Sequence, residues 1–226
     1  MSGPPTNSVH LGVLGGTGKE GSGLAFRWAH AGYRVTLGSR DPLRAAAVAN
    51  EINQCLGSSL VDGTSNENAA AAATIVVLTV PYAAQLETLR LVEAQLNGKI
   101  LIDVTVPLRP PQVATAQLPA SGSAVVDAQA MLGSAVRVVS AFQNVSAEHL
   151  RNVDDPIDCD VFVCADDRGA RETVVALGRA IGITTHPAGA LANSAAAEAL
   201  TSVLIALNRH YKIKNSGLRI TGIPSA

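Results

Sequence analysis

Apolar and polar positions along the chain predict parallel strands joined by helical crossovers. Nearly continuous β-branched and apolar runs predict strands over residues 9–14, 33–37, 74–80, 99–106 and 137–144. Helices are expected between them over residues 21–31, from a cap at Asp41 to about Cys55, and from Asn66 or Asn68 onward. Because such continuous apolar strands are covered on both faces, the pattern indicates an α/β fold with a doubly wound parallel sheet.

The C-terminal third shows a looser alternation of the same elements. Strands are predicted over residues 160–164 and 184–187, with a helix over residues 168–181 between them. A long last helix is expected to begin near Asn193, because apolar side chains recur there at helical spacing. These side chains are Leu200, Val203, Leu204, Leu207 and Tyr211.

A glycine-rich segment follows the first predicted strand and opens the first predicted helix. It has the spacing Gly16-x-Gly18-x-x-Gly21. In this pattern the first glycine permits a tight turn, the second lets the backbone approach a pyrophosphate, and the third lets helix and strand pack closely. Lys19 is followed by Glu20 where an ATP-binding phosphate loop has serine or threonine. The sequence therefore predicts a dinucleotide site in a Rossmann domain.

The end of the second predicted strand indicates which dinucleotide is bound. NAD sites carry an aspartate or glutamate there, which binds the ribose 2′-hydroxyl. This chain has Ser39 and Arg40 instead, and Arg44 follows one helical turn later. A hydroxyl and a guanidinium bind a 2′-phosphate, which a carboxylate would repel. We therefore expect NADP(H).

Composition and charge argue against nucleic-acid and membrane partners. Seventeen Lys and Arg balance eighteen Asp and Glu, and only 3% of residues are aromatic. Mean hydropathy is +0.24, but the most apolar run, residues 69–80, is shorter than the roughly 20 residues of a membrane span. The first eight residues lack the features of a secretory signal.

Cysteine and histidine usage predicts neither disulfides nor a metal site. Cys55, Cys159 and Cys164 are odd in number and have no CxxC spacing. We interpret all three as reduced, small apolar residues with the usual burial of cysteine, in a cytoplasmic protein. The five histidines are scattered along the sequence.

Short motifs along nearly the whole chain, about residues 9–223, resemble those of the deazaflavin (F420)-dependent NADP reductases. They are Leu14-Gly15-Gly16-Thr17-Gly18, Gly38-Ser39-Arg40, Leu78-Thr79-Val80-Pro81, Val139-Ser140-Ala141-Phe142, residues 160–167 and Leu191-Ala192-Asn193-Ser194. The N-terminal motifs are common to many NADP enzymes, and the C-terminal ones are narrower. In looser form the latter are similar to the NADPH-oxidising domain of the STEAP metalloreductases, where a flavin accepts the electrons.

The resemblance implies two domains with F420 in the cleft between them. We place an NADP-binding Rossmann domain at residues 8–145 and a small C-terminal α/β domain at residues 146–226. Hydride would pass directly between nicotinamide C4 and deazaflavin C5, so the protein aligns two cofactors and needs no catalytic side chain. The sequence agrees, since no nucleophile–base pair or metal-ligand cluster stands out in it.

The resemblance also implies a role for individual positions. Thr17, Gly18, Lys19 and Glu20 would line the pyrophosphate, Ser39 and Arg40 would bind the 2′-phosphate, Val80 and Pro81 would border the nicotinamide, and Val106, Pro107, Gln143, Val145, Asn193 and Ser194 would lie near the deazaflavin. For the apolar members of this set, core packing is an alternative role.

One departure from the family affects the choice of acceptor. The family's motif carries a histidine where this chain has Gln143, which offers a donor and an acceptor but does not titrate. Two alternatives to F420 reduction therefore stay open: an NADPH-dependent reductase of FMN, FAD or an imine, and a non-catalytic NADPH sensor. The apolar stripe of the last helix and the apolar tail at residues 218–223 can pack internally or across a two-fold axis, and we expect a homodimer because symmetric dimers are the commonest oligomers.

Overall fold

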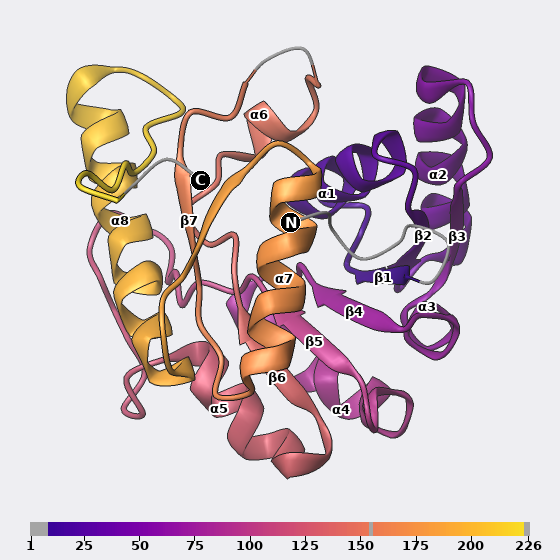
Figure 1. Ribbon diagram of the computed structural model, residues 1–226, viewed down its shortest axis with the longest axis horizontal. Coiled ribbons are helices and arrows are strands. Elements are labelled where there is room, and N and C mark those ends of the chain that lie inside the picture. Colours follow the sequence, from indigo (N-terminus) through magenta and orange to yellow (C-terminus); the bar gives the residue numbers. More distant parts are fainter. Residues whose placement is uncertain (1–8, 154–155, 224–226) are drawn as a thin grey trace.

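The computed structural model describes residues 9–153 and 156–223, and a six-stranded parallel sheet forms its centre (Figure 1). The strands are β1 (His10–Leu14), β2 (Arg34–Ser39), β3 (Val61–Ser65), β4 (Ile75–Leu78), β5 (Ile100–Asp103) and β6 (Arg137–Ser140). Their spatial order is β3-β2-β1-β4-β5-β6. This order reverses beside β1, so a crevice opens at the carboxyl ends of β1 and β4. The predicted doubly wound fold is confirmed.

Helices cover both faces of the sheet. On one face the apolar side chains pack against α1 (Lys19–His30), α2 (Pro42–Leu56) and α7 (Arg168–Ala180). On the other they pack against α3 (Asn66–Ala72), α4 (Gln85–Leu96) and α5 (Ala124–Leu132). The absence of polar alternation in β4 follows from this arrangement, because each of its four residues is buried.

The C-terminal third forms a smaller layer beside the main sheet (Figure 1). It contains α6 (Ala147–Leu150), β7 (Asp160–Val163), β8 (Thr184–Pro187), η4 (Leu191–Asn193) and α8 (Ser194–Tyr211). Helix α7 connects β7 to β8. Strands β7 and β8 pair in parallel, and an antiparallel bridge between Ser140 and Cys164 links them to β6.

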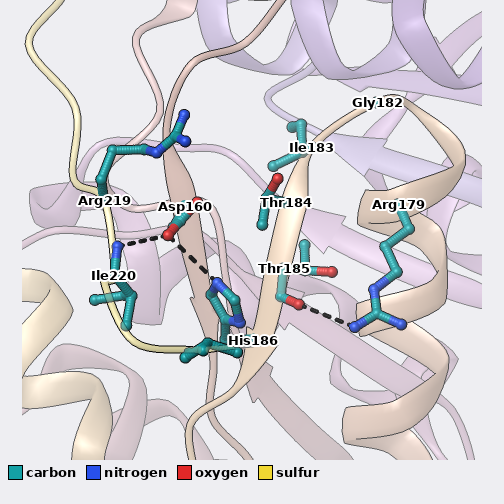
Figure 2. Close-up of a pocket in the computed structure, with 10 residues that line it drawn as sticks. Asp160, Arg179, Gly182, Ile183, Thr184, Thr185, His186, Arg219 and Ile220 are labelled. Atoms are coloured by element: carbon teal, nitrogen blue, oxygen red, sulfur yellow. Dashed lines mark hydrogen bonds and ion pairs between the residues drawn. The ribbon is translucent and has the colours of Figure 1, made fainter. Parts of the chain in front are cut away.

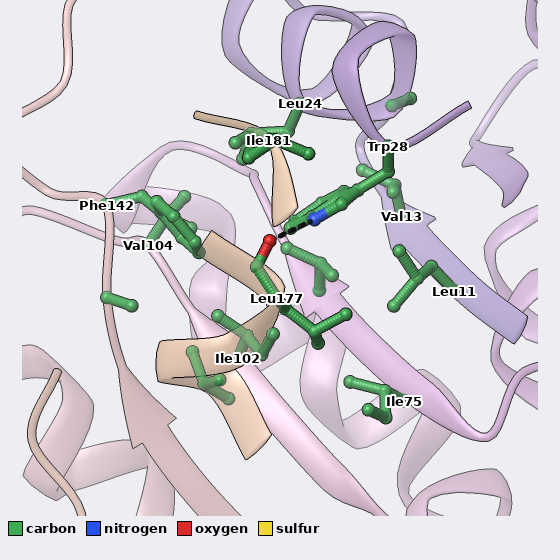
Figure 3. Close-up of a cluster of buried hydrophobic side chains, with 14 of the residues drawn as sticks. Leu11, Val13, Leu24, Trp28, Ile75, Ile102, Val104, Phe142, Leu177 and Ile181 are labelled. Atoms are coloured by element: carbon green, nitrogen blue, oxygen red, sulfur yellow. Dashed lines mark hydrogen bonds between the residues drawn. The ribbon is translucent and has the colours of Figure 1, made fainter. Parts of the chain in front are cut away.

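A single hydrophobic core joins this layer to the main sheet (Figure 3). The Trp28 ring of α1 meets the Phe142 ring edge-on at 5.9 Å between centroids, and its Nε1 donates to the Leu177 carbonyl at 3.2 Å. The buried Arg27 guanidinium donates to four backbone carbonyls of the C-terminal part, those of His149, Leu150, Asn152 and Ile181. The packing is continuous between the residues before and after position 145. The domain boundary predicted there therefore stays a prediction.

The observed strands end earlier than the sequence pattern predicted. The segments expected at 74–80, 99–106 and 137–144 stop at Leu78, Asp103 and Ser140. The residues after each strand end turn away from the sheet and form loops at its carboxyl edge. These loops carry the candidate site.

The sequence pattern missed β3 and α4, and one cysteine prediction is wrong. β3 contains Asp62 and Gly63, which are poor strand formers, but a Cβ at Gly63 would overlap the Ala45 backbone of α2, so glycine allows close packing there. Cys159 and Cys164 are buried as expected, whereas Cys55 near the end of α2 is exposed. All three cysteines are free.

Within the described ranges, one helical segment, Leu191–Tyr211, is long and apolar enough to cross a membrane by length and composition alone. It packs against α5 and β7, and its Glu198 side chain is buried in hydrogen bonds to Ser123 and to the first amides of α5.

Candidate functional site

A cavity of about 870 Å³ lies at the carboxyl edge of the main sheet. This is within the range of roughly 300–1,000 Å³ that small-molecule sites occupy. It brings together twelve of the residues predicted for the site: Thr17, Gly18, Lys19, Glu20, Ser39, Arg40, Arg44, Val80, Pro81, Val106, Gln143 and Val145. Residues far apart in the sequence, from α1 to the loop after β6, therefore face one space.

The glycine loop connects β1 to α1 at one end of this cavity. A Cβ at Gly16 would lie 2.7 Å from a Leu37 methyl, and one at Gly21 would overlap the Thr79 hydroxyl, so these two glycines serve packing. A Cβ at Gly18 would meet only the Gly15 carbonyl oxygen, at 3.5 Å. Gly18 is the N-cap of α1 and provides no side-chain cap, so the first amides of the helix are left for an anionic ligand.

The end of β2 supplies the cationic part of the cavity. Arg40 and Arg44 are exposed, and neither has an ion-pair partner in the described part of the chain. The neighbouring Asp41 carboxylate is occupied with capping α2, since its Oδ1 accepts from the amides of Leu43 at 3.0 Å and Arg44 at 3.2 Å. The site thus offers two free guanidiniums where NAD-binding proteins have a carboxylate.

The loop after β6 holds Gln143 with an unsatisfied acceptor. Its Nε2 donates to the Asp103 carbonyl at 2.8 Å and to Ser140 Oγ at 2.9 Å, which fixes the orientation of the amide. Its Oε1 is buried and has no partner among the described residues. Unsatisfied buried acceptors are costly, so this oxygen marks a place where a ligand donor is expected.

An unusual backbone conformation positions Gln143. The preceding Phe142 has φ of 72°, a left-handed conformation that costs a bulky residue about 1 kcal/mol or more. This geometry directs the Phe142 ring into the core against Trp28, while Gln143 lines the cavity. The Thr201 hydroxyl of α8 donates to the Gln143 carbonyl at 3.0 Å and supports the loop from the other side.

The end of β5 forms a buried polar layer beneath this loop. Asp103 is fully buried, and its carboxylate accepts from Gln85 Nε2 at 2.6 Å and from the Thr105 amide at 2.9 Å. Burial raises the pKa of Asp103, which these hydrogen bonds partly offset. The layer fixes residues 104–106 where they border the cavity.

Glu20 is a carboxyl in the cavity lining whose pKa is shifted from its ordinary value. It lies in the first turn of α1 and is only partly exposed. Burial raises the pKa of Glu20 to about 8.

Five predicted residues lie outside the cavity lining: Gly16, Gly21, Pro107, Asn193 and Ser194. Ser194 is fully buried and donates to the Leu191 carbonyl, while Asn193 donates to the Ala188 carbonyl, so both stabilise the start of α8. Conversely, the structure adds Asn66, Thr79, Tyr82, Thr105, Leu108 and Thr201 to the lining. Asn66 and Thr201 carried no signal in the sequence, because only the tertiary structure brings α3 and α8 to the glycine loop and to Gln143.

A second cavity, of about 490 Å³, lies between β8 and the C-terminal segment (Figure 2). Some of its polar groups pair with one another. Asp160 Oδ2 accepts from the Ile220 amide at 2.6 Å and lies 3.3 Å from His186 Nε2, and Arg179 donates to the Thr185 carbonyl. None of the residues predicted for the dinucleotide lines it.

The strand order defines a Rossmann-fold protein, and the glycine loop at the crevice and the basic end of β2 are features of an NADP-type dinucleotide site. Comparison with known proteins identifies its family. The model of the family "NADP oxidoreductase coenzyme F420-dependent" matches residues 10–107. The F420-dependent NADP reductase of Methanothermobacter thermautotrophicus is 39% identical over 223 residues, which are 96% of each chain. The chain belongs to the F420-dependent NADP reductase family.

Two further matches extend this result. A crystal structure from Arthrobacter sp. FB24, provisionally assigned as an F420-dependent NADP reductase, superimposes with a TM-score of 0.80 at 27% identity, covering 94% of this chain and 99% of that one. Rat metalloreductase STEAP3 is 31% identical over 87% of this chain, which corresponds to 37% of its own length.

Proposed function

We propose that the protein transfers a hydride reversibly between NADP(H) and coenzyme F420 in the 870 Å³ cavity, directly between nicotinamide C4 and deazaflavin C5. Membership of the F420-dependent NADP reductase family makes it an enzyme that uses these two cofactors. One observation of this chain supports the shared cavity above all: Gln143, whose Oε1 is buried and has no partner among the described residues, lines the same cavity as the glycine loop.

The NADP half of the proposal uses the glycine loop and the end of β2. The backbone at Thr17, Gly18 and Lys19 would hold the pyrophosphate, because the space over Gly18 is open. Ser39, Arg40 and Arg44 would bind the 2′-phosphate, the guanidiniums through charge-assisted hydrogen bonds.

The F420 half uses the loops after β5 and β6. Gln143 Oε1 would accept from an N–H at the polar edge of the ring, while the amide's own donors stay on Asp103 and Ser140. Val106 and Val145 would contact the ring, and Val80 and Pro81 the nicotinamide. Asn193 and Ser194 would act indirectly, by fixing the start of α8.

The chemistry in this proposal belongs to the cofactors, which exchange the hydride when bound together. The residues of the chain orient the two rings and exclude water with the apolar side chains around them. None of these residues is required to act as a nucleophile or a general base.

Absorbance at the band of oxidised F420 tests the proposal. Purified protein is mixed anaerobically with F420 and NADPH, and FMN, FAD and NADH are run in parallel. Rapid bleaching of F420 with NADPH alone is the expected result. Bleaching of FMN or FAD but not F420 would instead favour the flavin alternative, which the glutamine at position 143 motivates. Tight NADPH binding without reduction of any acceptor would favour a sensor.

Gln143→Leu is expected to raise the KM for F420 about 10-fold or more and to leave the Kd of NADPH unchanged. Leucine has a similar size but offers no acceptor to the ring, and a lost buried hydrogen bond is worth about 1–3 kcal/mol. Gln143→His, which restores a polar group, serves as the matched control and should keep the KM within about threefold. Equal changes in F420 and NADPH affinity would contradict this role.

We also propose that the protein is a cytoplasmic homodimer joined through α8. Val203, Leu207 and Tyr211 leave 47%, 40% and 65% of their surface exposed along this helix. Light scattering on a sizing column should give twice the chain mass of 23.1 kDa, and Leu207→Glu should give the monomer. A monomeric wild-type protein would contradict the proposal.

A further inference from the structure

Glu20 places a carboxyl group inside a loop that is otherwise built for anions. It is the second residue of α1, two residues after the Gly18 N-cap, and it lines the cavity together with Lys19, Gln143 and Val145. It makes no hydrogen bond or ion pair with any residue that the structure describes. The family resemblance places Glu20 beside the pyrophosphate, where a second negative charge is unfavourable, and the proposed function gives it no other role.

The packing of α1 holds Glu20 in the cavity. Gly23, one turn further along the same side of the helix, lies against Leu150, since a Cβ there would come within 2.6 Å of the leucine Cβ. Helix α6 and the loop leading to it therefore cover this side of α1. Glu20 lies one turn before Gly23 on this side of α1, and it lines the cavity together with the glycine loop and Gln143.

No nearby cation is committed to neutralising Glu20. On α1 itself, Lys19 is exposed, and Arg27 is engaged with backbone carbonyls of the C-terminal part. On the elements packed against α1, Arg151 donates to the Ser22 hydroxyl, and the cavity-facing Arg40 and Arg44 belong to the 2′-phosphate end. The other charged or titratable groups of α1, the neighbouring elements and the cavity include His10 and Arg34 at the opposite end of the sheet, His30, Asp41, Glu51, Cys55, Tyr82, Glu87, Glu148 and His149.

We infer that Glu20 binds a proton when NADP(H) enters the cavity, so that the neutral carboxyl is the form of the enzyme that holds the dinucleotide. The inference rests on the proposed NADP(H) site. The diphosphate brings two negative charges next to a poorly hydrated carboxyl, and only the protonated form avoids the repulsion. One proton from solvent joins the Glu20 carboxylate, and no bond of the dinucleotide changes.

The sign of the pH dependence follows from linkage. Because burial raises the pKa of Glu20 to about 8, most molecules carry the neutral form at pH 7 and bind NADP(H) without taking up a proton. Above pH 8 the free protein carries the charged form, and binding requires protonation. If only the neutral form binds, the Kd of NADPH rises about 10-fold per pH unit there, and about 30-fold in all between pH 7 and 9.5.

Titration calorimetry of NADPH binding in two buffers of different ionisation enthalpy tests the inference at pH 8. The wild-type protein is expected to take up about half a proton per NADPH, since about half of Glu20 is ionised at its pKa. Glu20→Gln, which has the shape of the neutral carboxyl, should take up about half a proton less and bind NADPH with a Kd that is flatter with pH. Glu87→Gln removes an exposed carboxylate from the same cavity and should leave the proton uptake as in the wild type.

The possible outcomes separate this inference from the proposed function. Equal proton uptake by the wild type and Glu20→Gln, with NADPH still bound, would overturn the role of Glu20 and leave the NADP(H) site intact. Absence of NADPH binding by the wild type at pH 7 would overturn the site itself. A structural role alone would change affinity in Glu20→Gln equally at every pH.

Discussion

Gly18→Val is expected to abolish NADP(H) binding and leave the protein folded, whereas Gly21→Val is expected to damage the fold. At Gly18 the backbone has φ of −74°, which any residue adopts, and a side chain would extend into the open space proposed for the pyrophosphate. At Gly21 a Cβ would overlap the Thr79 hydroxyl and lie 2.9 Å from the Gly16 Cα. The two glycines of one motif therefore have different roles: Gly18 leaves space for the ligand, and Gly21 allows close packing.

Chemical denaturation and NADPH titration, applied to both variants, separate these effects. The free energy of unfolding should fall by only about 1 kcal/mol for Gly18→Val, the cost of a poorer N-cap. For Gly21→Val it should fall by about 3 kcal/mol or more, because the overlap involves backbone as well as a side chain. Unchanged NADPH affinity in Gly18→Val would remove the dinucleotide from this loop.

Arg40→Ala is expected to weaken NADPH binding about 10- to 150-fold and NADH binding less than about twofold. The lost hydrogen bonds to a 2′-phosphate correspond to about 1.5–3 kcal/mol, and NADH has no such phosphate. Arg40 is exposed at the end of β2 and pairs with no described acid, so its removal should leave stability unchanged. The comparison of the two Kd values, measured by fluorescence titration, checks the prediction.

Arg44→Ala provides the matched control for this experiment. It lies one helical turn beyond Arg40, on α2, and lines the same end of the cavity. A smaller loss of NADPH affinity is expected from it, since Arg40 is closer to the strand end where the 2′-phosphate is bound. An equal loss of NADPH and NADH affinity in Arg40→Ala would show that Arg40 does not bind the 2′-phosphate.

The pair of unequal glycines illustrates how far a motif predicts a structure. The spacing of Gly16, Gly18 and Gly21 predicts the turn, the approach to a ligand and the close packing as three separate demands. The structure shows which residues impose the packing demands: Leu37 lies against Gly16 and Thr79 against Gly21. No local sequence pattern identifies these neighbours. The local sequence pattern predicts that a residue must be small. The structure shows which neighbouring atoms a larger side chain would overlap.

The limits of the sequence are clearest at the edges of the sheet. Strand β3 was missed because its pairing with β2 and its cover by α2 outweigh the poor strand propensity of Asp62 and Gly63. The predicted strands ran past Leu78, Asp103 and Ser140 because most of the residues after them are also apolar or β-branched. Apolar character does not distinguish a buried strand from a loop that lines an apolar site.

By itself, the sequence determined the alternation of strands and helices, the dinucleotide loop and the basic end of β2, because each of these depends on residues close together in the chain. Only the tertiary structure decided that Gln143 keeps an unsatisfied acceptor, that Thr201 supports its loop, and that Ser194 serves α8. It also placed Glu20 in the lining of the cavity, where desolvation raises its pKa to about 8. Such properties depend on which distant segments exclude water from a group, and that is settled only when the chain folds.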